Sequence, residues 1–176
     1  MRSLLIDDVI LKERCALDIN VQGQYVRTAI ETAQEIELQT IIGTNLLDAL
    51  CDRYDHNNLT GAYATLYNDY VIPFMVNQSV SNVLLPISFK VCNEGVVSTG
   101  SDNSVQQGLQ DVQRLETFYK NRADFYADRM TDWLKANSNN IPEWNTRRSC
   151  ADMPSRSGGY TTGIYLEGEA GCGCDK

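Results

Sequence analysis

Residues 24–50 constrain the fold most, because they read as two amphipathic helices that meet at one glycine. The apolar residues that share one face of the first helix are Val26, Ile30, Ala33 and Ile36. Gly43 stands just past this pattern, and a glycine there can take the left-handed conformation that ends a helix. Thr44 is expected to cap a second helix over residues 44–55. The result is a compact helical corner without a catalytic motif, which favours an assembly component.

Length and composition indicate one ordinary globular domain. The chain has 176 residues, 43% of them hydrophobic and 22% charged, which allows one well-buried core. We predict a helical domain over residues 1–144 and an extended or partly disordered C-terminal arm over residues 145–176. Asp7 and Asp8 interrupt the first apolar run, so we expect no secretory signal. No apolar run approaches the roughly 20 residues that cross a bilayer, so no membrane is expected as a partner.

The predicted fold class is mainly α: a bundle of four to five helices with a small β-hairpin insertion and the C-terminal arm. Asp7 or Asp8 is expected to cap a short first helix. Pro73 is expected to kink or split a third helical stretch, because proline lacks the N–H that a helix interior needs. The apolar stretch that follows should be the most buried helix, and Pro86 is expected to end it.

The pattern changes from helical to alternating at residues 87–99, with a turn at Asn93, Glu94 and Gly95. This change predicts the small hairpin. A hairpin inserted between helices is unusual in a plain helical bundle. The hairpin residues expected to contact a partner or another copy are Phe89, Val91, Val96 and Val97.

The longest helix is predicted over residues 104–136, with Ser104 as its cap. Its apolar residues recur at spacings of three or four, so we expect them to face the core and anchor the fold. The residues of this stripe are Val105, Leu109, Val112, Leu115, Tyr119, Tyr126, Met130 and Trp133.

An acidic face is predicted on the same helix, because Asp124, Asp128 and Asp132 follow one another at four-residue spacing. Such carboxylates repel each other by a few tenths of a kcal/mol per pair. Two interpretations stay open. Either the face is simply solvated, or it contacts Arg147 or Arg148 of an adjacent copy.

The composition shifts after Trp144, since residues 145–176 hold half of the twelve glycines and no helical period. Within this arm the residues from Tyr160 to Leu166 alternate, which is typical of a strand that pairs with another sheet edge. A partly disordered tail is the alternative. In the first case the expected contact residues are Tyr160, Ile164 and Tyr165.

No motif indicates an enzyme or a cofactor. His56 is the single histidine and lies in a predicted turn, so no nucleophilic triad has a well-placed base. Phosphate-binding, dinucleotide-binding and zinc-helix motifs are absent from the sequence. Cys172 and Cys174 are weak metal candidates, because zinc needs four ligands and the pair supplies two. They could instead link copies by disulfides after release into an oxidising environment.

The charge balance argues against a nucleic-acid-binding protein. The formal net charge is −8 and the sequence pI is about 4.6, the opposite of the basic surface that holds a phosphate backbone. An acidic surface suits a conduit that lets DNA pass without gripping it. Solubility is the more general explanation for the same charge.

The run from Tyr25-Val26-Arg27 to Ala33-Gln34, followed by Ile42-Gly43-Thr44-Asn45-Leu46, resembles the head-to-tail connector proteins of tailed bacteriophages. More narrowly, it is similar to connector-like proteins of phages of Bacteroidetes, including the crAss-like group. The helical pattern of residues 1–144 is covered by the resemblance.

This resemblance implies a non-catalytic virion protein that is assembled in the host cytoplasm. Copies would form a ring, expected to be dodecameric, in the neck beneath the portal protein. The ring would extend the DNA channel without sequence-specific DNA binding and would dock the next neck or tail protein. The alternatives are a small cytoplasmic helical adaptor or regulator and a cysteine-based metal or redox module.

Overall fold

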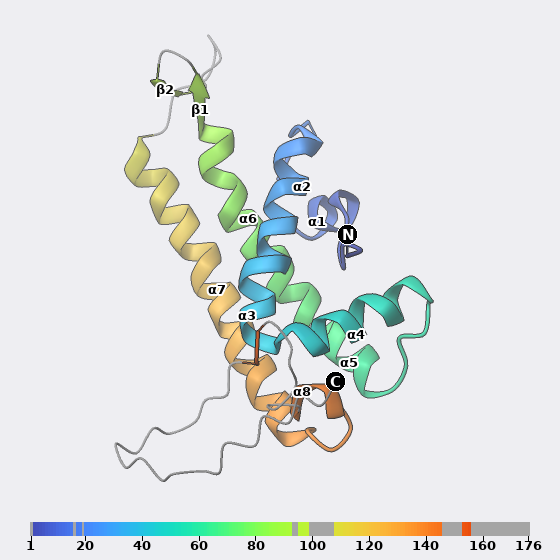
Figure 1. The fold of residues 1–176 in the computed structure, drawn as a ribbon. Helices are drawn as coiled ribbons and strands as arrows, with labels where there is room; N and C mark the ends of the chain where they lie inside the picture. Colours follow the sequence, from blue (N-terminus) through green and yellow to red (C-terminus); the bar gives the residue numbers. More distant parts are fainter. Residues whose placement is uncertain are drawn as a thin grey trace, which may run out of the picture.

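The computed structural model describes residues 2–15, 17–18, 20–92, 95–98, 108–145 and 153–155. Within these ranges the protein is mainly α-helical, which confirms the predicted class (Figure 1). The helices are α1 (Asp8–Arg14), α2 (Gly23–Thr32), η1 (Ala33–Leu38), α3 (Gln39–Ile42), α4 (Thr44–Asp55), α5 (Ala62–Leu66), η2 (Tyr67–Val71), α6 (Ile72–Ser88), α7 (Leu109–Ala136) and α8 (Pro142–Asn145). The strands β1 (Phe89–Cys92) and β2 (Gly95–Ser98) pair antiparallel, with Phe89 opposite Ser98.

The N-terminal segment is fastened to the helical corner by a buried glutamine. Asp7 caps α1 as predicted, since its side chain accepts a hydrogen bond from the Ile10 N–H at 2.8 Å. Before this cap, the Gln34 side chain accepts from the Leu5 N–H and donates to the Ser3 carbonyl, both at 2.9 Å. Gln34 is fully buried, so these bonds replace the water that its amide loses on folding.

The first of the two helices predicted within residues 24–50 is present, but it contains one π-helical stretch. α2 passes into η1 and then into α3 without a break in the helical backbone. In η1 the wider turn carries Gln34 inward, while Ile36 points outward and is 60% exposed. The prediction that Ile36 shares the buried face is therefore wrong, because a π turn shifts the positions that follow it.

The corner between α3 and α4 turns at Gly43, as predicted, with φ +81° and ψ 162°. The predicted role of Thr44 as a helix cap is wrong. Thr44 is the first residue of α4, and its hydroxyl accepts hydrogen bonds from the Gln39 amide at 2.8 Å and from the Met153 N–H at 3.0 Å. The Thr44 hydroxyl thus binds these partners and does not cap α4. Gly43 stands at the cap position, where no side-chain hydrogen bond is formed.

A long helical run from Ala62 to Ser88 forms the centre of the molecule. Neither proline breaks it where expected. Pro73 lies in the first turn of α6, directly after η2, where the hydrogen-bond ladder already changes from π to α. Pro86 lies inside α6 on its exposed side, where water can satisfy the carbonyl that proline leaves free, and the helix ends two residues later at Ser88.

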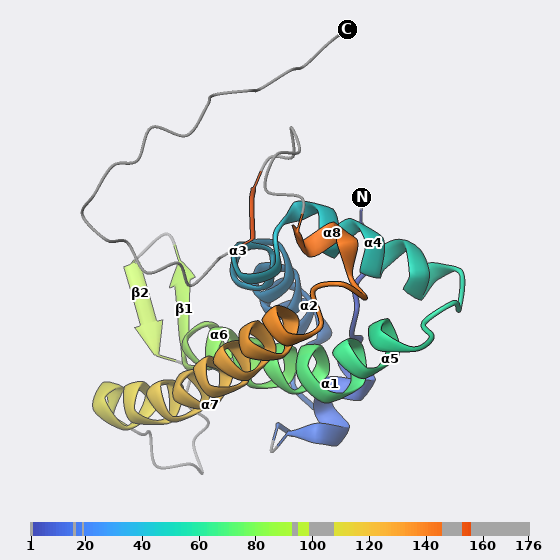
Figure 2. The same cartoon turned by 90° about the horizontal axis from the view of Figure 1, so that it is seen from below.

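By length and composition alone, the run Ala62–Ser88 could cross a bilayer, with a mean hydropathy of 1.2 over its most apolar window and 61% of that window buried in the protein. A core helix of a soluble protein passes the same test. The packing explains the composition, since α6 contacts α2 on one side and α7 on the other. Figure 2 shows α6 between these two helices. The prediction that this helix is the most buried one is confirmed.

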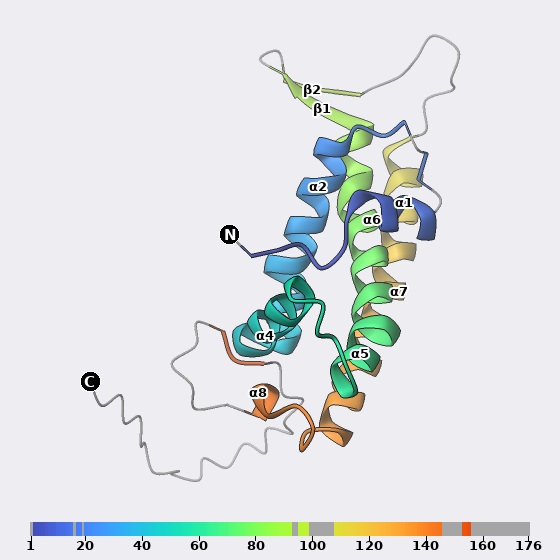
Figure 3. The same ribbon diagram turned by 90° about the vertical axis from the view of Figure 1, so that its right-hand side faces the viewer.

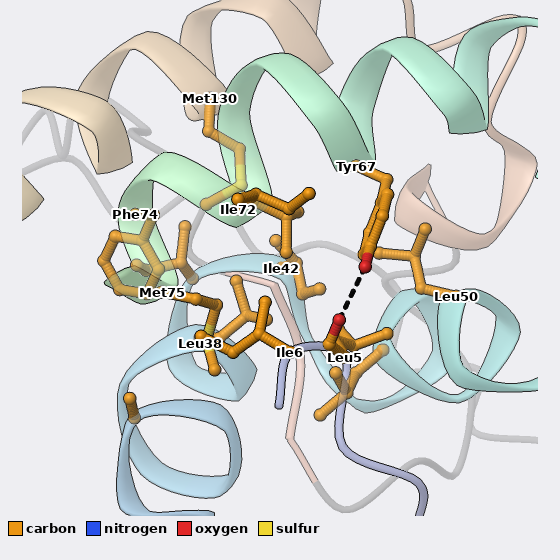
Figure 4. Packing of buried hydrophobic residues seen from close by; sticks show 14 of the residues in the cluster. Leu5, Ile6, Leu38, Ile42, Leu50, Tyr67, Ile72, Phe74, Met75 and Met130 are labelled. Carbon is orange, nitrogen blue, oxygen red and sulfur yellow. Dashed lines mark hydrogen bonds between the residues drawn. The ribbon is translucent and has the colours of Figure 1, made fainter. Parts of the chain in front are cut away.

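The main core lies where α6, η1, α4 and the N-terminal segment meet (Figure 4). Leu5 and Ile6 are fully buried there, although they precede the first helix. The Tyr67 hydroxyl donates to the Leu5 carbonyl at 2.6 Å, and burial raises the pKa of Tyr67, which keeps the hydroxyl a donor. Phe74 in α6 is 2% exposed.

The helix α7 differs from the prediction in its start and in its packing. It begins at Leu109 after Gly108, and the predicted cap Ser104 and the stripe residue Val105 lie outside the described residues. Met130 is fully buried as expected. Leu109 and Leu115 are 51% and 45% exposed, so their predicted burial is wrong. Helical spacing places residues on one face, but here no described element covers the first turns of that face.

Two ends of the molecule are built differently. The paired strands β1 and β2 lie at one end of the α6–α7 pair, while α4, α5 and α8 lie at the other (Figures 1 and 3). The four-residue helix α8 was not predicted, and its Trp144 is buried at 8% exposure. Of the predicted arm, the structure describes only Asn145 and residues 153–155.

Candidate functional site

A seven-residue repeat marks the outer side of α7. The pattern Phe-Tyr-x-x-Arg occurs at residues 118–122 and again at residues 125–129. Seven residues make about two helical turns, so equivalent positions of the two repeats lie on the same face. The tyrosines turn partly toward the core and are half-buried, whereas Phe118 and Phe125 are 53% and 59% exposed. The repeat therefore gives α7 two aromatic faces, of which only one is covered.

The exposed phenylalanines are paired with arginines. The Arg122 guanidinium lies 5.6 Å from the ring centroid of Phe118, and the Arg129 guanidinium lies 5.7 Å from that of Phe125. Arg129 also lies 5.4 Å from the ring of Tyr70 on η2, so the surface continues onto the neighbouring element. Each contact lies within the range of a cation–π interaction. We call Leu115, Phe118, Arg122, Phe125 and Arg129 the aromatic stripe.

The aromatic stripe has unused interaction capacity. Neither Arg122 nor Arg129 forms an ion pair with any residue that the structure describes. Fully burying a phenylalanine contributes about 1.5–3 kcal/mol relative to leaving it exposed. Contiguous exposed apolar surface of this kind marks interaction sites in soluble proteins. The stripe is therefore suited to bind a protein surface.

A groove lies on the other flank of α7. Its volume is about 480 Å³, with α6 as its floor and α2 and α7 as its walls. Its lining includes the apolar residues Tyr25, Ala29, Leu85 and Pro86. On the α7 side, Glu116 lines the groove. The groove is open and elongated along the helices, which suits a side chain or a helix edge better than a small enclosed ligand.

One carboxylate lines the groove and a second lies behind its residue Asn82. Glu116 lines it directly and forms no ion pair with a described residue. The Glu37 side chain reaches the groove residue Asn82, whose amide donates to Glu37 Oε1 at 3.4 Å, and Gln78 donates to the same oxygen at 3.3 Å. Glu37 Oε2 is buried and has no hydrogen-bond partner among the described residues. Two carboxylates near the groove thus lack a cation.

The Gly43-Thr44 corner binds part of the predicted arm. The Thr44 N–H donates to the Met153 carbonyl at 2.9 Å, and the Met153 N–H donates back to the Thr44 hydroxyl at 3.0 Å. Ser155 lies so close that a Cβ on Gly43 would be 2.6 Å from its backbone nitrogen. We call Gly43, Thr44 and the segment Met153–Ser155 the arm notch. Glycine is required there both for its backbone conformation and for this close approach.

A polar cluster fixes α8 against α4 and α5. Arg53 Nη2 lies 3.3 Å from Glu143 Oε1, the Tyr63 hydroxyl donates to Glu143 Oε2, and the Arg53 guanidinium lies 3.8 Å from the Tyr63 ring centroid. Burial opposes ionisation of Glu143, but hydrogen bonds from Tyr63, from its own backbone and from Arg53 outweigh it and lower its pKa. These contacts join three helices, so the cluster is a structural fastening.

The single histidine lies apart from the aromatic stripe and the groove. His56 is exposed at the end of α4, as predicted, and its Nδ1 lies 2.7 Å from the Asp52 carbonyl. This backbone contact and the Asp52 charge raise its pKa. No group of three or more His, Cys, Asp or Glu residues that could hold a metal ion occurs in the described ranges.

The structure brings few of the predicted site residues together. Phe89 is half-buried at the start of β1, and the side chains of Val91, Val96 and Val97 are not among those described. Asp124, Asp128 and Asp132 are all exposed, and Asp132 pairs with Lys135 at 3.0 Å. Outside the described residues lie Arg147, Arg148, Tyr160, Ile164, Tyr165, Cys172 and Cys174.

The aromatic stripe was missed by the sequence reasoning, which searched for one apolar face per helix. Phe118 and Tyr119 are adjacent, as are Phe125 and Tyr126, and adjacent residues cannot share a helical face. The seven-residue repeat was the available signal. It indicates a second face with its own pattern of aromatic and basic residues.

Comparison with known proteins identifies one family. The model described as "Family of unknown function (DUF6712)" matches residues 38–153, which begins at the last residue of η1 and ends at Met153 in the arm notch. No curated protein and no solved structure matches the chain. The matched region contains the aromatic stripe and crosses the domain boundary that was predicted at residue 144.

Proposed function

We propose that this chain, which belongs to the DUF6712 family of unknown function, is a structural subunit of a bacteriophage virion. Copies would form a ring in the neck, between the portal protein and the tail. The ring would extend the DNA channel and dock the next neck or tail protein. In this role the protein acts through its surfaces and carries out no reaction.

The observation that carries the proposal is the uncovered aromatic stripe on a long, rigid helix. Phe118 and Phe125 are each more than half exposed, although most apolar residues of α6 are buried. A protein that assembles into a ring must present such surface in the free subunit and cover it in the assembly. The resemblance of residues 25–46 to connector proteins is the reason for placing this assembly in the phage neck.

The charges agree with a wall that faces DNA. The chain carries a formal net charge of −8, and Asp124, Asp128 and Asp132 are exposed together on α7. Each phosphate contact by a basic residue adds affinity, so a channel that must release a genome is better lined by acidic groups. We assign the acidic face of α7 to the lumen side on this ground.

The two ends of the molecule suit contacts in two directions. The strands β1 and β2 lie at one end of the α6–α7 pair, and the arm notch lies toward the other (Figure 3). We propose that the hairpin contacts a neighbouring subunit or the tail side. The arm, which is fixed to the helical corner at Met153, would reach the portal or an adjacent subunit from the opposite end.

The decisive experiment images the purified chain by electron microscopy, alone and mixed with the portal protein encoded in the same genome. Ring-shaped density added to the portal is the expected result. A portal without added density, together with a lone small particle, would refute the neck assignment and favour a cellular adaptor. Elemental analysis of the same sample tests the cysteine-based alternative, since a stoichiometric metal would implicate Cys172 and Cys174.

A further inference from the structure

We propose that the aromatic stripe of one copy seats in the groove of the next copy, so that two different surfaces of the same chain form the contact between subunits. The occupant of the groove is thus a second copy of this chain. This inference rests on the proposed function, since it specifies how copies join in the ring. A single kind of contact would then cover both the aromatic stripe and the groove.

The two surfaces face away from each other, as such a contact requires. Glu116 reaches into the groove, and Phe118 follows it by two positions on the same helix. At 3.6 residues per turn, side chains two positions apart point about 200° apart. The stripe and the groove therefore lie on opposite flanks of α7. A contact between unlike surfaces on opposite flanks repeats from copy to copy, and it closes into a ring where the rotation permits.

The charges of the two surfaces are complementary. Arg122 and Arg129 stand on the stripe without an acidic partner in the described ranges, and Glu116 and Glu37 stand at the groove without a basic one. Bringing the stripe to the groove would place a guanidinium beside the Glu116 carboxylate, whereas Glu37 Oε2 is buried within its own chain. Because the phenylalanines exclude water around this pair, the pair contributes more than an exposed one does.

The groove also matches the stripe in chemistry and form. Its apolar lining by Tyr25, Leu85 and Pro86 offers contact to an aromatic ring, and Leu85 is itself exposed in the single chain. Ile36 follows the groove residue Thr32 by four positions on the same helical run and is 60% exposed. Docking a helix edge in the groove would thus cover apolar side chains on both partners.

Other occupants fit less well. Two stripes packed against each other would place arginines of one copy against arginines of the other, which is repulsive. A nucleic acid would meet Asp124 and Asp128 beside the stripe, on a chain with a net charge of −8. A second copy presenting its groove is the partner whose charge and apolar surface both agree.

Sedimentation velocity of the full chain over a concentration series tests this contact. The stripe variant carries Phe118→Glu and Phe125→Glu, and the groove variant carries Thr28→Trp, which fills the groove from the exposed side of α2. Val9→Glu is the matched control, since Val9 is 55% exposed and belongs to neither surface. We expect the wild type and the control to assemble, and each variant alone to stay monomeric. Thermal unfolding of each variant verifies its fold.

Mixing the two variants distinguishes unlike from like contacts. The stripe variant keeps an intact groove, and the groove variant keeps an intact stripe. Together they can form a single contact, so we expect one-to-one complexes and nothing larger. Assembly of the groove variant alone to the wild-type extent would overturn the inference and indicate contact between two stripes.

A charge exchange supplies a test that does not depend on filling the groove. Arg122→Glu and Glu116→Arg should each weaken assembly by about tenfold, because each places like charges at the contact. The double variant in one chain should recover most of the loss. Absence of recovery, or a wild type that stays monomeric at every concentration, overturns the inference. A wild type that is monomeric alone but adds ring-shaped density to the portal would still support the neck function. The two proposals can therefore fail separately.

Discussion

Replacing Gly43 by alanine gives the sharpest test of the arm notch, because the added methyl group has two separate effects. Gly43 has φ +81°, a region in which a residue with a side chain costs about 1–3 kcal/mol. The new Cβ would also lie 2.6 Å from the Ser155 nitrogen and 3.2 Å from the Met153 carbonyl oxygen, closer than the packing allows. The segment Met153–Ser155 must then move away.

The cost of that movement follows from the contacts it breaks. Two hydrogen bonds join Thr44 to Met153, and each contributes about 1 kcal/mol. Together with the backbone strain, Gly43→Ala should lower the free energy of unfolding by about 3–5 kcal/mol. For a chain of this size, that corresponds to a fall in Tm of about 6–20 °C.

Two other glycines provide matched controls. Gly61 also has a positive φ, +56°, but nothing lies within 4 Å of its added Cβ, so Gly61→Ala reports backbone strain alone. Gly23 starts α2 in open space, so Gly23→Ala should be neutral or stabilise the protein by up to about 1 kcal/mol. Urea denaturation of the three variants separates strain from displacement.

Hydrogen exchange identifies the segment that moves. In Gly43→Ala the amides of Thr44 and Met153 should exchange faster, because both donate across the notch, while amides in the middle of α6 keep their protection. If Gly43→Ala costs no more than Gly61→Ala and leaves these two amides protected, the reasoning about the arm notch is wrong.

Three further predictions concern other contacts. Gln34→Leu should lower the free energy of unfolding by about 1–3 kcal/mol in urea titrations, because it leaves the buried Leu5 N–H without a partner. The pKa of Glu143 is lowered in the folded state, so its stabilising contribution is present above the unfolded value of 4.5 and is lost as the pH falls below it. In Glu143→Gln, the free energy of unfolding should therefore depend less steeply on pH between pH 6 and pH 3 than in the wild type. An unchanged slope would contradict this. Burial raises the pKa of the Cys51 thiol to about 11, so a maleimide should label Cys51 at neutral pH only when the protein unfolds.

Local signals in the sequence predicted local structure well. Asp7 caps α1, Gly43 turns the corner, and α4 has the predicted bounds Thr44–Asp55. Each of these depends on residues a few positions apart. The π-helical stretches were not predicted, since one wider turn alters the spacing of apolar residues by too little to be seen among the irregularities of a real pattern.

Contacts between distant residues explain the failures. Thr44 looks like a helix cap by itself, and its actual partner Met153 is 109 positions away. Leu115 has the spacing of a core residue, but spacing does not say whether another element covers that part of the helix. The same limit hid the candidate site, because a buried and an exposed phenylalanine look alike in a sequence.

The arm notch sets an order for the maturation of the chain during synthesis. A ribosome makes the corner residues Gly43 and Thr44 early, yet their partner Met153 emerges only after the whole of α7 and α8. Helices can form and pack as they leave the exit tunnel, whereas contacts of such long sequence separation must wait. The corner is therefore completed last. A truncated product that lacks Met153 would contain the helices but would lack both hydrogen bonds that close the notch.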